Sequence, residues 1–197
     1  MDRLDEVLAV AEPLLARVDR LLETAGAPAG HRLWSELRRV RLLPGDAARA
    51  VAALRPAAFG DAVPELRAEA RACAEVAADL PPPGSWTGDA AEAYDGLRRR
   101  VAERLSGDGE SLDERLEATA DLAQALGDWM AKARADLAMA LATVLGSQEV
   151  VALSNGDAAP DAAAEVAAHV LQTVAESYAD ADDLLQGSAG LADAAPM

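Results

Sequence analysis

The stretch Pro81-Pro82-Pro83-Gly84-Ser85-Trp86-Thr87-Gly88 decides how this 197-residue sequence folds. Three consecutive prolines end a helix, because proline lacks the backbone N–H and its ring clashes with the preceding turn. The glycines on either side of Trp86 permit backbone conformations that other residues avoid. Alanine-rich segments with helical spacing lie before and after this stretch. It therefore predicts the turn of a helical hairpin.

The composition predicts an all-α fold. Alanine is abundant, aromatic residues make up only 3% of the chain, and no run alternates β-branched or aromatic residues with polar ones. Alanine, leucine, glutamate and arginine are strong helix formers. A chain of 197 residues is also long enough for one domain with its own core.

Apolar residues recur at helical spacing along most of the chain. Pro13 is expected to kink the first helix or to start a second one. A capping box of Ser111 and Glu114 opens the longest helix, and the segment from Ser147 to Pro160 is predicted to be a loop. The predicted helices cover about residues 2–24, 31–42, 46–54, 61–80, 87–106, 111–146 and 160–185.

The four longest helices after residue 60 each carry an apolar stripe that is expected to face a core. In the third of these stripes the steps alternate between four and three residues, as in a coiled coil. In chain order the stripes are Leu66, Ala70, Cys73, Val76 and Leu80; Ala90, Tyr94, Leu97, Val101 and Leu105; Leu112, Leu116, Thr119, Ala123, Leu126, Met130, Ala133, Leu137, Ala140 and Val144; and Ala163, Val166, Val170, Val174, Ser177, Ala181 and Leu184.

Four such helices can close an elongated antiparallel bundle made of two helical hairpins, one turning at Trp86 and one at Asn155. We expect residues 57–186 to form this bundle and the extra helices of residues 1–56 to pack on it or to cap one end. Residues 187–197 are small and polar and are predicted to be a disordered tail.

The charge of the chain excludes several classes of partner. Eighteen Lys and Arg residues against 34 Asp and Glu residues give a net charge of −16. Phosphate backbones and anionic membrane surfaces need basic partners, so we expect neither nucleic acid nor lipid binding. The amino terminus lacks the features of a signal peptide, and no stretch reaches the length of a membrane span. The acidic faces would suit a basic protein partner.

No catalytic or cofactor-binding motif is present. Cys73 is the only cysteine, which excludes an internal disulfide, and His31 and His169 lie outside any metal-binding pattern. Phosphate-binding glycine loops and nucleophile elbows are absent. We therefore expect no metal, no cofactor and no enzymatic activity, although an unrecognised site in a polar pocket would change that interpretation.

Two short motifs favour recognition. Trp86-Thr87-Gly88 places a large apolar ring and a permissive glycine in the predicted turn; alternatively, the ring only fills a gap at the bundle end. Tyr178 and Asp182 are spaced i, i+4 near the end of the last helix, so they share one face; alternatively, Tyr178 is an ordinary packing residue.

Taken together, in this order along the chain, the two motifs resemble the WXG (Trp-X-Gly) superfamily, the substrates and partners of the type VII (ESX) secretion system of actinobacteria. The run from Trp86 to Tyr94, in which small residues and then an aromatic follow Trp-X-Gly, is especially similar. The resemblance covers residues 61–106, and residues 160–186 by motif only. Short family members form one hairpin and dimerise, whereas this chain has two hairpins and resembles the longer single-chain secreted members.

This resemblance implies that Trp86, Gly88, Tyr178 and Asp182 form a bipartite signal that a secretion ATPase reads. It implies a protein that is cytoplasmic before export and is then secreted without a cleaved signal peptide. Its partners would be that ATPase, or a co-encoded WXG-like or toxin protein, in a homo- or hetero-oligomer. The alternative is a cytoplasmic acidic adaptor or immunity-like protein that binds a basic partner. In the favoured hypothesis, Trp86 and Tyr178 are expected at the same end of the bundle.

Overall fold

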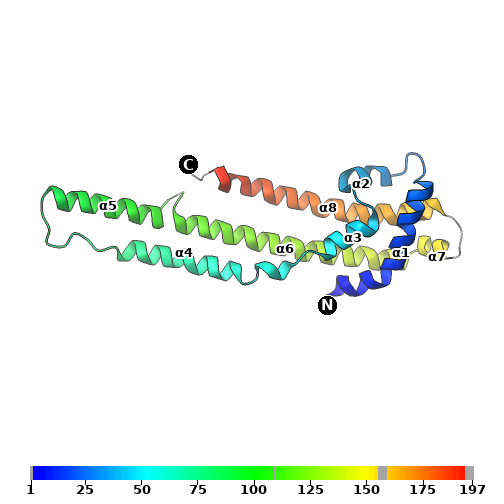
Figure 1. Cartoon of the computed structure of the whole chain (residues 1–197), viewed down its shortest axis with the longest axis horizontal. Helices are drawn as coiled ribbons and strands as arrows, with labels where there is room; N and C mark the ends of the chain where they lie inside the picture. The colour runs from blue at the N-terminus through cyan, green and yellow to red at the C-terminus, as the bar shows by residue number, and fades with distance from the viewer. Residues whose placement is uncertain (1, 109, 155–158, 194–197) are drawn as a thin grey trace. The chain divides into compact units, whose positions relative to one another are not determined.

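The computed structural model describes residues 2–108, 110–154 and 159–193, with side chains up to Gly187. Every regular element in these residues is helical, which confirms the all-α prediction (Figure 1). The elements are α1 (Arg3–Ala25), α2 (Leu33–Val40), α3 (Pro44–Ala52), a 3-10 helix (Pro56–Phe59), α4 (Ala62–Asp79), α5 (Asp89–Leu105), α6 (Leu112–Leu145), α7 (Gln148–Ser154) and α8 (Pro160–Asp193).

Most predicted helices are found within a few residues of their expected bounds, and the differences have local causes. α3 begins at Pro44, since proline suits the first turn of a helix. α7 occupies part of the predicted loop after Ser147. The predicted turn at Asn155-Gly156-Asp157 lies outside the described residues.

The two ends of the long helices also differ from expectation. α8 continues through Asp193, so residues 187–193 are helical rather than a disordered tail; residues 194–197 lie outside the described part. At the start of α6, the predicted capping box is replaced by a different arrangement. Asp113 accepts hydrogen bonds from the hydroxyls of Ser106 and Ser111, both at 2.5 Å, and from the backbone N–H of Glu114.

Pro13 lies inside α1 without interrupting it. The helix is assigned continuously from Arg3 to Ala25, and Figure 1 shows it bending along its length. A bend is expected where a proline removes one helical hydrogen bond and its ring crowds the preceding turn. Of the two alternatives for Pro13, the structure therefore favours a kinked helix over two separate helices.

The chain forms two compact units. Unit 1 comprises Met1–Pro56 and Asp128–Asp183, and unit 2 comprises Ala57–Gly127 and Leu184–Met197. The predicted division after residue 56 stays a prediction, and in the structure residues 57–186 are shared between the two units. Their second half joins the amino-terminal helices instead, because these helices supply the apolar surface that covers it. α6 and α8 each contribute residues to both units.

Unit 1 holds a large hydrophobic core. α1 packs against α3, and the first five residues of the stripe predicted for α8, Ala163 to Ser177, are buried. Many core positions are alanine, which lets helix backbones approach closely. The core includes Leu4, Leu15, Val18, Leu33, Ala47, Ala48, Ala133, Leu137, Leu141, Val166, Val170, Leu171 and Val174.

A buried arginine fastens three helices of unit 1. The guanidinium of Arg134 on α6 donates to the carboxylates of Asp2 at 2.6 Å and Asp5 at 2.9 Å, at the start of α1. It also donates to the backbone carbonyls of Ala52, the last residue of α3, and of Leu54, two residues further on. The hydrogen bond from Arg134 holds the pKa of Asp2 down, at about 2 instead of 3.8. Arg134 therefore satisfies carbonyl groups that the end of α3 would otherwise leave unpaired.

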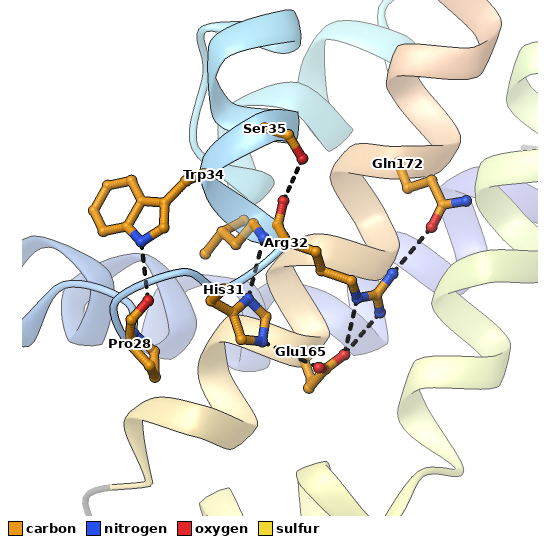
Figure 2. Close-up of polar contacts among 8 residues, drawn as sticks. Pro28, His31, Arg32, Trp34, Ser35, Glu165 and Gln172 are labelled. Carbon is orange, nitrogen blue, oxygen red and sulfur yellow. Dashed lines mark hydrogen bonds and ion pairs between the residues drawn. The ribbon is translucent and has the colours of Figure 1, made fainter.

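A second polar cluster fastens α2 to α8 (Figure 2). Arg32 donates two hydrogen bonds to Glu165, at 2.7 and 3.2 Å, and one to Gln172 at 3.0 Å. His31 lies 3.0 Å from the other carboxylate oxygen of Glu165, and its second ring nitrogen accepts the backbone N–H of Leu33. The hydrogen bond from Arg32 lowers the pKa of Glu165, and the His31 contact adds to that effect.

The polypeptide leaves α2 through a left-handed residue. Arg41 has φ 60° and ψ 22°, and its backbone N–H donates to the carbonyl of Leu37, as in a helix C-cap. Glycine is the usual residue in this conformation, since a Cβ atom there costs about 1–2 kcal/mol. Arg41 is thus a strained position on the surface of unit 1.

The core of unit 2 is small. Its hydrophobic cluster consists of Val63 on α4 and Ala120 and Ala123 on α6, against which Phe59 and Leu66 pack; Ala70, Ala77 and Ala91 are buried as well. Arg67 on α4 reaches Asp121 on α6 at 2.9 Å, an exposed ion pair that adds little stability. α4 also contacts α5. Few apolar residues therefore hold this unit together.

Candidate recognition site

The loop between α4 and α5 reverses the direction of the chain (Figure 1). α4 ends at Asp79, and Leu80 leaves the helix with φ −58° and ψ 119°, the extended conformation that a following proline favours. Pro81 to Pro83 carry the chain away from α4, and the backbone N–H of Trp86 donates to the carbonyl of Pro83. The predicted helix-breaking turn is therefore confirmed at residues 80–88.

Trp86 faces solvent. It is 64% exposed, so the alternative in which the ring only fills a gap at the bundle end is wrong. The ring instead lies against Tyr94 of α5, with centroids 5.7 Å apart and planes tilted by 57°. The Tyr94 hydroxyl donates to the carbonyl of Pro81 at 2.9 Å. Tilted aromatic pairs are favourable, so Tyr94 positions the Trp86 ring and ties the loop together.

Gly88 is required by its backbone conformation. It precedes α5 with φ 83° and ψ −174°, a region open essentially only to glycine, and its carbonyl accepts from the N–H groups of Ala91 and Glu92. An added Cβ atom would meet nothing within 4 Å, so the requirement is conformational and not steric. This confirms the sequence-based explanation for the glycine of the Trp-X-Gly tripeptide.

The apolar stripe predicted for α5 is largely uncovered. Leu97 is 53% exposed and Val101 is 37% exposed, whereas Ala91 is the buried residue of this helix. On α4, Val76 of the predicted inner face is exposed as well. The stripe residues of α5 therefore form a solvent-facing apolar surface that continues from Tyr94 and Trp86.

Arginines flank this apolar surface. Asp95 pairs with Arg98 at 2.9 Å and Arg99 at 3.0 Å, and the hydrogen bond from Arg98 is the main cause of the lowered pKa of Asp95. Arg100 and Arg104 have no ion-pair partner in the described part of the chain. The carboxyl half of α5 is thus a basic, apolar helix face in an acidic protein.

Tyr178 and Asp182 lie on α8 in different environments. Tyr178 is half-buried and packs against the core of unit 1, while Asp182 is exposed. The neighbouring turn is fastened to α6: Trp129 donates to the carbonyl of Ser177 at 2.8 Å, and Lys132 pairs with Asp180 at 3.0 Å. The Tyr178 ring therefore packs against the core, as in the alternative interpretation of this residue.

The four predicted signal residues belong to different units. Trp86 and Gly88 lie in unit 2, whereas Tyr178 and Asp182 lie in unit 1. Their predicted proximity stays a prediction. The sequence analysis did not single out Arg134, the Arg32–Glu165 cluster or Trp129. Each of them bonds to a residue far away in the sequence, and local sequence does not distinguish such a residue from an ordinary surface residue.

No metal site or single membrane-spanning helix is found in the residues with a described placement. None of their His, Cys, Asp and Glu side chains form a group of three that could hold a metal ion. Cys73 is a free, partly buried thiol. No single described helix is long and apolar enough to cross a bilayer; α6 and α7 meet the criterion only as a pair bent by 59°.

Comparisons of the chain with protein-family models, with characterised proteins and with solved structures found no match.

Proposed function

We propose that this protein acts by protein–protein recognition, as a type VII (ESX) secretion substrate or as a helical escort of one, similar to the WXG superfamily. The observation that carries the proposal is the Trp86 ring, which is 64% exposed and lies against Tyr94, whose hydroxyl is bound to the Pro81 carbonyl. A large ring that faces solvent in a fixed position binds a partner without losing much conformational freedom.

The uncovered stripe of α5 supports the same proposal. Leu97 and Val101 offer apolar area to a partner helix, and Arg100 and Arg104 offer charge to its carboxylates. Docking of an amphipathic helix along such a face is a common recognition mode. A secretion ATPase, or a co-encoded WXG-like or toxin protein, is the partner that this proposal requires.

In the full proposal, the two hairpins pack as an antiparallel bundle and bring Trp86 beside Tyr178 and Asp182 as one composite signal. Cross-linking tests this arrangement. Cysteines introduced by Ser85→Cys and Asp182→Cys, in a Cys73→Ser background, should react within one chain with a short bismaleimide. A pair at Ser85→Cys and Gln148→Cys is the control. If the test pair does not cross-link, or cross-links no more than the control pair, the composite signal is contradicted and Trp86 alone remains as the proposed recognition element.

Export is the decisive experiment. In an actinobacterial host with an active type VII system, Trp86→Ala should abolish appearance of the protein in the culture supernatant while leaving its helical circular dichroism unchanged. Trp34→Ala is the matched control, because Trp34 is a second exposed tryptophan, 43% accessible, in unit 1. Asp182→Asn tests the second motif without disturbing the core. Unchanged export of Trp86→Ala would contradict the proposal.

A second function is favoured by the net charge of −16. An acidic adaptor or immunity-like protein would bind a basic partner through its carboxylates, and that association would weaken steeply with salt. Salt-sensitive binding to a co-encoded basic protein, with no export and no effect of Trp86→Ala, would establish this function instead.

A further inference from the structure

A shallow groove, here named the basic groove, lies where α2 meets α3. It is lined by Leu37 and Arg38 of α2 and by Arg41, Leu42 and Leu43 of the connection, and its volume is about 640 Å³. As far as the structure is described, its lining combines three leucine side chains with two guanidinium groups and has no carboxylate. This composition is unusual on a chain with a net charge of −16.

Among the described residues, the two arginines of the basic groove make no polar side-chain contact that would hold the fold together. Arg39, between them in sequence, pairs with Glu36 at 2.9 Å. Arg38 and Arg41 are exposed and make no ion pair or side-chain hydrogen bond within residues 2–108, 110–154 and 159–187. Their charges are therefore free to pair with an incoming ligand.

Arg41 occupies its position against the local backbone preference. It holds φ 60°, where a glycine would be unstrained. Strained backbone of this kind gathers at functional positions, because a residue kept there contributes through its side chain. The side chain of Arg41 has no ion-pair or hydrogen-bond partner among the residues with described side chains, so it is available to a ligand.

The helix that carries the groove is rigidly held. Arg32 and His31, just before α2, bind Glu165 of α8, and Arg32 also binds Gln172 (Figure 2). The groove is therefore formed before any ligand arrives, which reduces the ordering cost of binding.

We infer that the basic groove binds an acidic amphipathic helix of a partner protein. The leucines cover the apolar face of that helix, and Arg38 and Arg41 pair with carboxylates beside it. Charge complementarity selects this occupant: a basic helix would face two unpaired guanidiniums, and an anionic bilayer would repel the remaining acidic surface. The inference does not depend on the secretion proposal.

A synthetic peptide probe tests the inference on the full chain. The probe is a helical peptide with Leu at positions i, i+4 and i+7 and Glu on both flanks; a matched peptide has Lys in place of Glu. Titration followed by amide resonances should shift residues 37–43 with the Glu peptide alone, and binding should weaken between about 0.15 M and 1 M salt. Shifts centred on another surface, or equal binding of the Lys peptide, would overturn the inference.

Three variants place the interaction at the groove. Arg38→Glu with Arg41→Glu should weaken the Glu peptide by about tenfold or more, whereas Arg39→Glu should change its affinity by less than about twofold. Arg41→Gly should raise the urea midpoint of the protein and still weaken peptide binding. Equal affinity of the double variant and the wild type would overturn the inference. Binding of phosphatidylglycerol vesicles through the same residues, without peptide binding, would replace the protein ligand with a lipid surface.

Discussion

Unit 1 and unit 2 bury the same helix to different extents. The predicted apolar seam of α6 is buried in unit 1 at Ala133, Leu137, Ala140 and Val144. In unit 2 only Ala123 of that seam is buried, and Leu112 is exposed. The periodicity is the same in both halves, so it does not decide coverage. Whether the seam of α6 is buried depends on the other helices of each unit. In unit 1, α1, α3 and α8 cover this seam.

This difference separates stability from recognition. Unit 1 contains the large core and both polar clusters, whereas unit 2 contains the exposed Trp86 and the uncovered stripe of α5. A surface that stays apolar and solvent-facing is available to a partner, and a closed core is not. The predictions below test whether that division is real.

The largest effect is expected for a core truncation in unit 1. Leu137→Ala removes a side chain that is 1% exposed and should destabilise the protein by about 2–5 kcal/mol. Leu97→Ala removes the same atoms from the exposed stripe of α5 and should cost within about 0.5 kcal/mol. Urea unfolding monitored by circular dichroism measures both. Equal losses would mean that Leu97 is covered in solution, which would break the comparison.

Arg134→Met should cause the second-largest loss of stability. The change leaves Asp2, Asp5 and the carbonyls of Ala52 and Leu54 without their shared donor, at a cost of about 2–3 kcal/mol. Both carboxylates are partly exposed, which limits the penalty. Arg67→Met, which removes the exposed ion pair with Asp121 in unit 2, is the control and should change stability by less than about 1 kcal/mol. A larger loss from the control would contradict the small role assigned to that pair.

Gly88→Ala should act on the loop. The substitution forces a Cβ atom into φ 83° and should cost about 1–3 kcal/mol, observed as faster amide exchange in α5 with little change in unit 1. Gly96→Ala is the matched control: Gly96 lies inside α5, its added Cβ would meet the Arg100 side chain at 3.5 Å, and alanine should stabilise the helix by about 0.5–1 kcal/mol. Loss of protection after both changes would refute the conformational explanation.

The smallest effect is a pH dependence in unit 1. The pKa of Asp2 lies at about 2, below its ordinary value of 3.8, because Arg134 binds the ionised carboxylate. The stabilisation is therefore present above pH 3.8 and lost as the pH falls toward 2. Because Asp2 is half exposed, the change should be only about 1 kcal/mol. Asp2→Asn, which keeps an N-cap residue, should flatten this part of the pH profile, whereas Asp182→Asn should not.

The sequence predicts where helices lie better than it predicts which helices pack against each other. Helical periodicity and proline positions located seven helices, and the turn at Trp86 followed from three prolines and two glycines. α7 was missed because its seven residues give too short a pattern. The extension of α8 was missed because Gly187 and Gly190 argue against a helix when they are considered locally.

The site was predicted in part. The role of Gly88 follows from the residue type, because glycine suits the backbone conformation that it adopts. The exposure of Trp86 depends on which helices surround the loop, and helical periodicity does not predict that. The basic groove has only a weak signal in the sequence: Arg38, Arg39 and Arg41 cluster in an acidic chain. Arg39 is paired with Glu36, whereas Arg38 and Arg41 have no ion pair in the described part of the chain, and only the position of Glu36 relative to each side chain shows this difference.

The discontinuity of unit 1 has a consequence for synthesis. Residues 1–56 leave the ribosome before residues 128–183, which include the helical segments that complete their core. Residues 57–127 of unit 2 are made in between. The leucines of the amino-terminal helices therefore stay uncovered while about a third of the chain is translated. Arg134 can bind Asp2 only after that delay. A chaperone that shields apolar helices would find its substrate in this interval.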